Sequence, residues 1–177
     1  MILLARHGET TFNAERRFQG WSPRAVLTEK GRAQARELAD AAAQEDLAAL
    51  YTSPLVRARE TAAIVGERIG LEPQVDDRFA ETNTGDWTEV RYDDVDPDLF
   101  EAWKHAGEGW RYPGGESLEE QMERVVMGLV DVTQRGELPA LVVCHRGTIR
   151  VALCHSRQRG LDAFSEIDVP NGALVRL

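Results

Sequence analysis

The sequence predicts an α/β fold with three layers, in which helices cover both faces of a mostly parallel central sheet. Two observations support this: short apolar segments alternate with amphipathic helical segments along the chain, and turns rich in polar residues or glycine separate them. The 177 residues are enough for one domain with its own core. We therefore expect a single α/β domain over residues 1–177, with a small cap inserted at about residues 81–116.

The first half of the chain contains two expected strands, each followed by an expected helix. The strands are Ile2–Ala5 and Ala48–Tyr51. Thr28 is a typical N-cap and predicts a helix that continues to about Gln44. Ser53-Pro54 follows the second strand directly, and its residue types predict a helix with Ser as N-cap and Pro at the first helical position.

The middle of the chain has a different composition. Pro73–Val75 is expected as a short strand, and residues 81–116 then show weak periodicity with many Gly, Asp, Trp and Tyr residues. Within them, Asp96 and Pro97 predict the start of a short helix. We expect this region to form a cap over the sheet, in which the aromatic side chains either contact substrate or pack between cap and sheet.

The last third returns to strong helix and strand patterns. Ser117–Glu120 has the pattern of a capping box, and its helix is expected to end before Gly136. Leu141–Cys144 is an apolar strand, and another helix begins near Gly147. Two final strands are expected at residues 167–169 and 173–177, joined as a hairpin by residues 171–172, which are Asn-Gly.

Charge and composition exclude several classes of protein. The net charge of −9 argues against a nucleic-acid binder, which usually presents a basic face. No apolar run approaches the ~18 residues of a membrane span, and the N-terminus lacks the basic segment of a secretory signal, so we expect a cytoplasmic protein. The two cysteines, Cys144 and Cys154, stand in no metal-ligand pattern, so we expect no metal site.

Two histidines follow directly after predicted strands. His7 follows the first strand and His145 follows Leu141–Cys144, each within an Arg- and Gly-containing segment. Because ligands of open α/β sheets bind beyond the carboxyl ends of the strands, both imidazoles are expected at one edge. Arg57 also follows a strand, and its planar guanidinium matches two phosphate oxygens, as does that of Arg6. The combination predicts a pocket for a phosphoryl group.

Five segments in order resemble those of the histidine phosphatase superfamily, the phosphoglycerate mutase-like proteins. The segments, which together extend over nearly the whole chain, are Arg6–Thr10 with Asn13 and Gln19-Gly20, Leu27–Gly31, Ser53–Thr61, Glu81 with Gly85–Trp87, and Val142–Arg150. The resemblance implies that His7 is the nucleophile and forms a phosphohistidine, without metal or cofactor. It also implies that Arg6, Arg57 and His145 stabilise the transferred charge, that Asn13 donates a hydrogen bond to the phosphate, and that Glu81 is the general acid and base. We expect Gln19, Gly20, Arg146 and Gly147 to contact substrate as well.

Two of these assignments have alternatives. Glu89 and Glu9 are nearby carboxylates that could replace Glu81 as the acid. Arg146 stands where many relatives have glycine, and it either contacts a second anionic group of the substrate or points to solvent or a cap carboxylate.

The expected function is hydrolysis of a small phosphorylated metabolite. The Arg and Tyr contacts of the mutases are missing after Glu81, where Thr82, Asn83 and Thr84 stand, and this favours a phosphatase. The alternatives are a mutase that returns the phosphoryl group to its substrate, and a module that binds phosphorylated ligands without turnover. The helix-bearing edges leave room for a homodimer.

Overall fold

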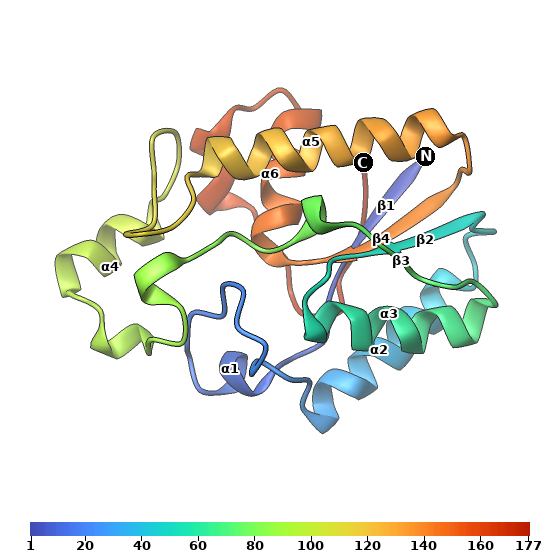
Figure 1. The fold of residues 1–177 in the computed structure, drawn as a ribbon, viewed down its shortest axis with the longest axis horizontal. Coiled ribbons are helices and arrows are strands. Elements are labelled where there is room, and N and C mark those ends of the chain that lie inside the picture. The colour runs from blue at the N-terminus through green and yellow to red at the C-terminus, as the bar shows by residue number, and fades with distance from the viewer.

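The computed structural model describes residues 1–177 and contains a sheet of five strands in the order β3-β2-β4-β1-β5 (Figure 1). Strand β1 pairs in parallel with β4, β4 with β2, and β2 with β3, whereas β5 is antiparallel to β1. The mostly parallel sheet that the sequence predicts is therefore confirmed. The strands are β1 Ile2–Arg6, β2 Ala49–Thr52, β3 Gln74–Val75, β4 Ala140–Cys144 and β5 Leu174–Arg176.

Helices cover both faces of the sheet, as expected. Helices α2 (Glu29–Ala42) and α3 (Val56–Ile69) lie below the sheet in Figure 1, and α5 (Leu118–Arg135) and α6 (Arg146–Ser156) lie above it. Successive side chains of a strand point to opposite faces, so Leu3 and Ala5 pack with α2 and α3, while Leu4 packs with α5 and α6. No helix combines the length and the apolar character that crossing a membrane requires.

Three predicted helix starts are confirmed by their caps. The Thr28 hydroxyl accepts a hydrogen bond from Gly31 N at 3.0 Å. Ser117 forms both hydrogen bonds of a capping box with Glu120. Asp96 caps the short helix α4 (Pro97–Lys104), which has proline at its first position.

The predicted start of α3 at Ser53-Pro54 is wrong by two residues. The helix begins at Val56 with Leu55 as N-cap. Ser53 instead extends the strand pairing, since its N–H donates to the Val143 carbonyl at 3.0 Å. Its hydroxyl lies 2.6 Å from the His145 ring and also accepts from Leu55 N at 3.2 Å, so it joins the end of the neighbouring strand to the N-cap residue of α3.

The predicted strand at residues 167–169, and with it the hairpin, is also wrong. Residues 161–166 form a 3₁₀ helix, and β5 pairs with β1 instead. The carbonyl of Ile167 accepts from Arg150 Nε at 2.6 Å, and that of Val169 accepts from Arg6 Nη1 at 2.7 Å. The backbone of this segment therefore binds arginine side chains in place of a strand partner.

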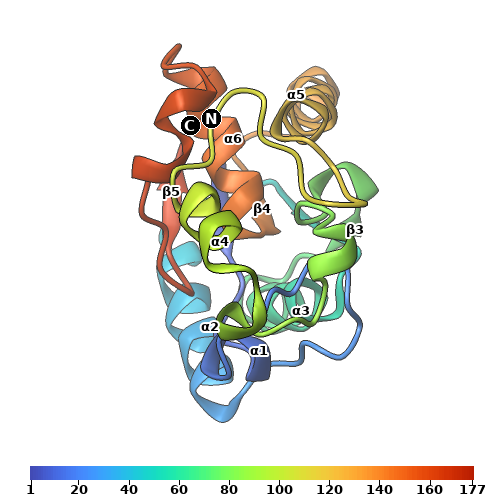
Figure 2. The same cartoon turned by 90° about the vertical axis from the view of Figure 1, so that its left-hand side faces the viewer.

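The segment 81–116 lies at one end of the sheet, to the left in Figure 1, and α4 faces the viewer in Figure 2. It contributes to a third apolar cluster that is separate from the two sheet cores, with Phe18, Trp87, Val95 and Tyr112 buried at its centre. Phe18 comes from the loop that follows the one-turn helix α1 (Thr11–Ala14). Aromatic side chains of the cap thus pack against the first loop of the chain.

Candidate active site

Three adjacent parallel strands bring the two predicted histidines together. Strand β4 lies between β2 and β1, and the carboxyl ends of all three point to one edge of the sheet. His7 N donates to the Cys144 carbonyl at 3.1 Å, which places His7 beside His145. The two ring centroids are 5.1 Å apart, and both side chains are almost completely buried.

The ring of His7 is held in one orientation and one tautomer. Its Nδ1 lies 2.7 Å from the Gly8 carbonyl oxygen, and because a carbonyl can only accept, Nδ1 must carry the proton. Burial, with the positive charges of Arg57 and Arg6, holds the pKa of His7 well below its usual value of 6.5. The imidazole is therefore neutral at neutral pH, and its Nε2 has a free lone pair.

His145 is fixed by a residue that the sequence interpretation assigned to a different task. Its Nε2 lies 2.6 Å from Ser53 Oγ, while its Nδ1 is buried without a partner in the chain. Burial and the charge of Arg57 lower the pKa of His145 well below 6.5. Ser53 stood in the predicted motif as a helix cap, so its contact with the second histidine was missed.

Two arginines at this edge have buried N–H groups without a hydrogen-bond partner. Arg57 is fully buried; its Nη2 donates to the Gly20 carbonyl at 2.8 Å, but its Nε and Nη1 have no partner in the chain. Arg6 Nη1 donates to Val169, and its Nε is likewise buried and unpartnered. Buried polar groups of folded proteins are nearly always satisfied, so such a concentration of free donors indicates a place for anionic oxygens.

Both arginines remain charged in spite of their burial. Desolvation is the largest cause that lowers the pKa of Arg57 to about 10 and that of Arg6 to about 10. These values are still well above neutrality, so each guanidinium has its positive charge where an anion would bind. In a site of low dielectric constant, such a charge attracts an anion more strongly than it would in water.

A cavity of about 80 Å³ opens at this edge and reaches the cap. The buried His7, Arg57 and His145 do not line it. The other seven predicted site residues do: Arg6, Asn13, Gln19, Gly20, Glu81, Arg146 and Gly147. Of the ten predicted residues, seven therefore line the cavity and three lie outside its lining.

The carboxyl group of Glu81 lies against Gly147. Its Oε2 accepts from Gly147 N at 3.3 Å, and its Oε1 accepts from Thr82 N at 2.9 Å. A Cβ atom at residue 147 would lie only 2.4 Å from Glu81 Oε1, so glycine is needed for this approach. The contact places Glu81 next to the helix that His145 caps.

The two alternative carboxylates are bound elsewhere and do not line the cavity. Glu9 accepts from Lys30 Nζ at 2.9 Å. Glu89 accepts from Ser22 Oγ at 2.6 Å and from Arg24 Nε at 2.9 Å. Glu81 is thus the only one of the three candidates in contact with the cavity.

The polar residues of the first loop present donors to the same cavity. Thr10 donates to Asn13 Oδ1 at 3.1 Å and to Gln19 Oε1 at 2.8 Å. The amide oxygens are therefore used within the loop, while the side-chain amide nitrogens of Asn13 and Gln19 have no partner in the chain. Gly20 has a φ of 45°, and a Cβ there would lie 2.3 Å from Thr84 Oγ1.

Two further residues that the sequence interpretation missed hold the Glu81 loop. Arg124 of α5 donates to the carbonyls of Ala80 and Glu81 at 2.8 and 3.0 Å, and Trp21 Nε1 donates to the Glu81 carbonyl at 2.7 Å. An arginine on an amphipathic helix carries no sequence signal for such a task. Arg124 is also paired with Glu116, which fixes its orientation.

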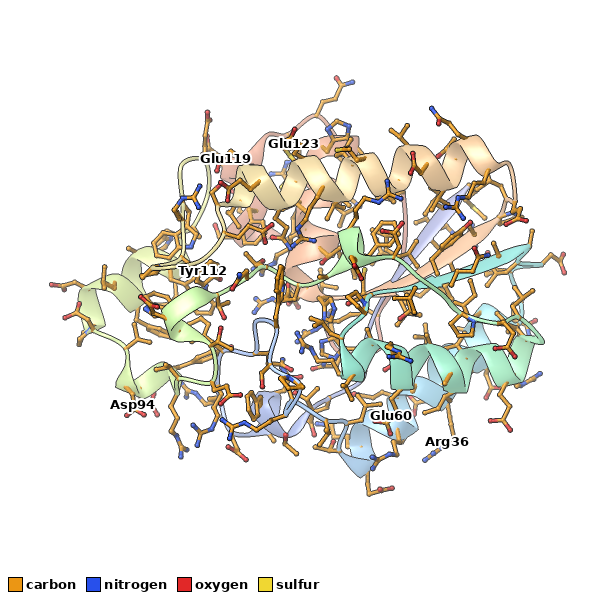
Figure 3. The ribbon with its side chains drawn as sticks, viewed as in Figure 1. Arg36, Glu60, Asp94, Tyr112, Glu119 and Glu123 are labelled. Carbon is orange, nitrogen blue, oxygen red and sulfur yellow. The ribbon has the colours of Figure 1, made fainter.

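Aromatic residues of the cap form the outer wall. Tyr92, Trp103 and Tyr112 line the cavity, and Tyr112 OH accepts from Trp103 Nε1 at 2.7 Å. Figure 3 places Tyr112 in the segment between α4 and α5, and places Arg36 and Glu60 on the helices of the opposite layer. The structure groups no three His, Cys, Asp or Glu side chains that could hold a metal ion.

Comparisons with known proteins agree with this arrangement. Residues 2–177 match the family model of the histidine phosphatase superfamily (branch 1). The chain is 36% identical over 171 residues to a probable phosphoglycerate mutase GpmB of Enterobacter sp. (strain 638), covering 93% of this chain and 77% of that protein.

Solved structures give the same result. A mycobacterial glucosyl-3-phosphoglycerate phosphatase superposes with a TM-score of 0.90 at 27% identity, over 98% of this chain and 90% of that one. A phosphoglycerate mutase from Thermus thermophilus superposes with a TM-score of 0.76 at 34% identity, with the same two coverages of 98% and 90%. The chain therefore belongs to the histidine phosphatase superfamily.

Proposed function

We propose that this enzyme is a metal-independent phosphatase that hydrolyses a small-molecule phosphomonoester through a phosphohistidine on His7. The observation that carries the proposal is the fixed tautomer of His7, whose Nδ1–H is bound to the Gly8 carbonyl at 2.7 Å. This contact leaves the Nε2 lone pair for attack on phosphorus, beside the unpartnered donors of Arg6 and Arg57.

In the first step, His7 Nε2 forms a bond to phosphorus as the bond to the ester oxygen breaks. Charge on the equatorial oxygens is stabilised by Arg57 Nε and Nη1, Arg6 Nε and His145, so no metal is needed for this task. Glu81, at the wall of the cavity, gives its proton to the leaving alkoxide. The products are an alcohol and a phosphohistidine.

In the second step, water replaces the alcohol. The carboxylate that Glu81 has become takes a proton from water, whose oxygen bonds to phosphorus as the bond to Nε2 breaks. Inorganic phosphate leaves, and both His7 and Glu81 return to their starting states. The contact of Glu81 with Gly147 N fixes the carboxyl group for both proton transfers.

The second candidate is a phosphoglycerate mutase, favoured by the name of the 36% identical relative. A mutase would share the first step and return the phosphoryl group to another hydroxyl of its substrate. Thr82 and Asn83, which follow Glu81, are used to hold the loop: Thr82 Oγ1 lies 2.6 Å from Gln121 and Asn83 Oδ1 accepts from Gly85 N at 3.0 Å. This use of the loop supports the phosphatase.

Phosphate release from a panel of metabolite esters in the presence of EDTA tests the proposal. Wild type is expected to release phosphate, and His7→Ala is expected to release none. Activity that is lost to EDTA, or retained by His7→Ala, would contradict it. Isomer formation from 3-phosphoglycerate with a trace of 2,3-bisphosphoglycerate, without free phosphate, would favour the mutase.

A further inference from the structure

The cavity contains more positive charge than one phosphoryl group requires. Its lining includes Arg6, Arg17, Arg146 and Arg150 against a single acid, Glu81, although the chain as a whole has a net charge of −9. Arg17 is paired with Glu15 at 2.6 Å, and Arg6 belongs to the phosphoryl site. Arg146 and Arg150 are therefore left without a task in the proposed reaction.

These two arginines are neighbours on one face of α6. They are four residues apart, a spacing at which like charges on a helix repel and destabilise it. Arg146 makes no hydrogen bond or ion pair within the chain, and its Nε is buried without a partner. Burial and the charge of Arg146 together lower the pKa of Arg150 to about 10, so Arg150 stays charged at neutral pH.

Arg150 is the more deeply buried of the pair, with an exposed fraction of 8%. Its Nε donates to the Ile167 carbonyl at 2.6 Å, and its guanidinium stacks over Phe164 at 5.2 Å from the ring centroid. These contacts hold the group in place but do not neutralise its charge. The segment 167–169, which the sequence predicted as a strand, is thus the support of this arginine.

The half-buried arginines that do not line the cavity are neutralised. Arg78 is paired with Asp76 at 2.7 Å and Arg124 with Glu116 at 2.6 Å. Neither Arg146 nor Arg150 has a carboxylate within ion-pair distance. For Arg146, this excludes the alternative in which it pairs with a carboxylate of the cap. Two repelling charges without acids, at the wall of a cavity, are the arrangement expected of an anion subsite.

We propose that Arg146 and Arg150 form a second anion subsite, so that the preferred substrates are phosphomonoesters whose leaving alcohol carries another anionic group, a carboxylate or a phosphate. This inference rests on the proposed function, since it assumes that the phosphoryl group binds at His7. Tyr92 and Trp103 form an aromatic wall of the same cavity. By excluding water, they strengthen the attraction between the two arginines and a bound anion.

Binding to a variant without the nucleophile tests the subsite independently of turnover. In a His7→Ala background, calorimetry compares two matched ligand pairs: 3-phosphoglycerate with glycerol 1-phosphate, which lacks the carboxylate, and fructose 1,6-bisphosphate with fructose 6-phosphate. In at least one pair, we expect the ligand with the second anionic group to bind about ten- to a hundredfold more tightly, as charge-assisted hydrogen bonds predict. The pair that discriminates identifies the second group as carboxylate or phosphate.

Removing the charge of Arg146 must then erase the preference. Arg146→Met is expected to lower the affinity for the ligand with the second anionic group by about tenfold or more. The affinity for the matched ligand without that group is expected to stay unchanged. Arg150→Met is expected to act in the same direction, with its melting temperature checked because it also loses the Ile167 contact. Arg157→Met is the control, since this exposed arginine at the end of the same helix lies outside the cavity.

Equal affinity for the two ligands of each pair would contradict the subsite. An Arg146→Met variant that binds both ligands of a pair more weakly, and by the same factor, would contradict it as well. The proposed function fails differently, through absence of phosphate release by the wild type or through retained activity in His7→Ala. If the protein discriminates between the ligands of a pair but the wild type releases no phosphate, the subsite is supported and the phosphatase function is contradicted.

Discussion

The edge of the sheet and the cap serve the same cavity but are built differently. At the sheet edge, His7, His145 and Arg57 are buried, and each stands directly after a strand or in the first turn of the helix that follows one. In the cap, the cavity wall consists of aromatic side chains around Phe18, packed in a cluster of their own. Strand pairing fixes the first region. The second region belongs to no sheet and is held by aromatic packing with isolated backbone hydrogen bonds, such as that from Phe18 N to the Val90 carbonyl at 3.0 Å.

This difference indicates a division of tasks. A phosphoryl group is the same in every substrate, so its site can be rigid and can be built from residues that the sheet holds in register. The rest of the substrate varies, and loops and caps can change without disturbing the sheet. Arg146 and Arg150 lie between the two regions, on the sheet's own helix but facing the cavity under the cap.

The largest expected effect is the loss of the proton donor at Glu81, which lies in the cavity wall and not among the buried residues of the sheet edge. Glu81→Gln keeps the shape of the side chain but removes the proton that the leaving alkoxide needs. Turnover of an alkyl phosphate is expected to fall about 10²- to 10⁴-fold, whereas p-nitrophenyl phosphate, whose leaving group needs no proton, changes far less. Steady-state kinetics with both esters measure the contrast. Glu89→Gln is the matched control, and an equal loss for the two esters would remove Glu81 from the acid role.

A somewhat smaller effect is expected at the sheet edge. Arg57→Lys keeps the positive charge but cannot supply the Nε and Nη1 donors that now have no partner. We expect kcat/KM to fall about 10²- to 10³-fold for every ester, because the phosphoryl group is common to all of them. Arg59→Lys, two residues later and exposed, is the control. A loss confined to some esters would place Arg57 in substrate choice instead.

A third variant tests whether the cap is stabilised separately. Phe18 contacts Trp87, Tyr92, Trp103 and Tyr112, and Phe18→Ala is expected to destabilise the cap by about 3–5 kcal/mol. Hydrogen exchange should then become faster in residues 81–116 and stay slow in β1 and β4. Leu38→Ala, in the core between sheet and α2, should speed exchange in the sheet. Uniform acceleration in Phe18→Ala would show that the two regions unfold together.

The smallest effect is a dependence of stability on pH. His7 and His145 have folded pKa values below the 6.5 of an exposed histidine, so the unfolded chain binds protons first as the pH falls. The two histidines contribute fully to stability above pH 6.5. Below pH 6.5, the free energy of unfolding falls by at most about 1.4 kcal/mol per pH unit for each histidine.

Urea denaturation between pH 7.5 and 5 measures this slope. His7→Gln is expected to reduce the slope, because one of the two titrating groups is gone. A wild-type protein that becomes more stable as the pH falls from 6.5 would contradict the assignment of both histidines as buried and neutral.

Local patterns were enough to predict most of the fold. Thr28, Asp96 and the Ser117–Glu120 capping box mark helix starts that the structure confirms, because a cap depends on residues within one turn of the chain. The same holds for the apolar strand before His145, whose side chains are all buried. Parallel pairing followed from the alternation of strands and helices.

The errors lie where distant residues compete for the same local groups. Ser53 is a residue type typical of a helix cap, but the sheet places it beside His145, 92 positions later. Its hydroxyl contacts the His145 ring as well as Leu55 N, and the helix begins two residues later than predicted. Residues 167–169 have the apolar pattern of a strand, but the carbonyls of Ile167 and Val169 are taken by Arg150 and Arg6. Sequence patterns report preferences of neighbouring residues and cannot report such competition.

By itself, the sequence determined the α/β class, most helix starts, and the histidines and arginines placed after the strands, because these depend on short-range periodicity and motif spacing. Only the tertiary structure decided that Glu81 rather than Glu9 or Glu89 reaches the cavity, that Arg124 and Trp21 hold its loop, and that Arg146 and Arg150 have no acid partner. Contact between residues far apart in the chain depends on how the elements pack, and that packing is a property of the whole molecule.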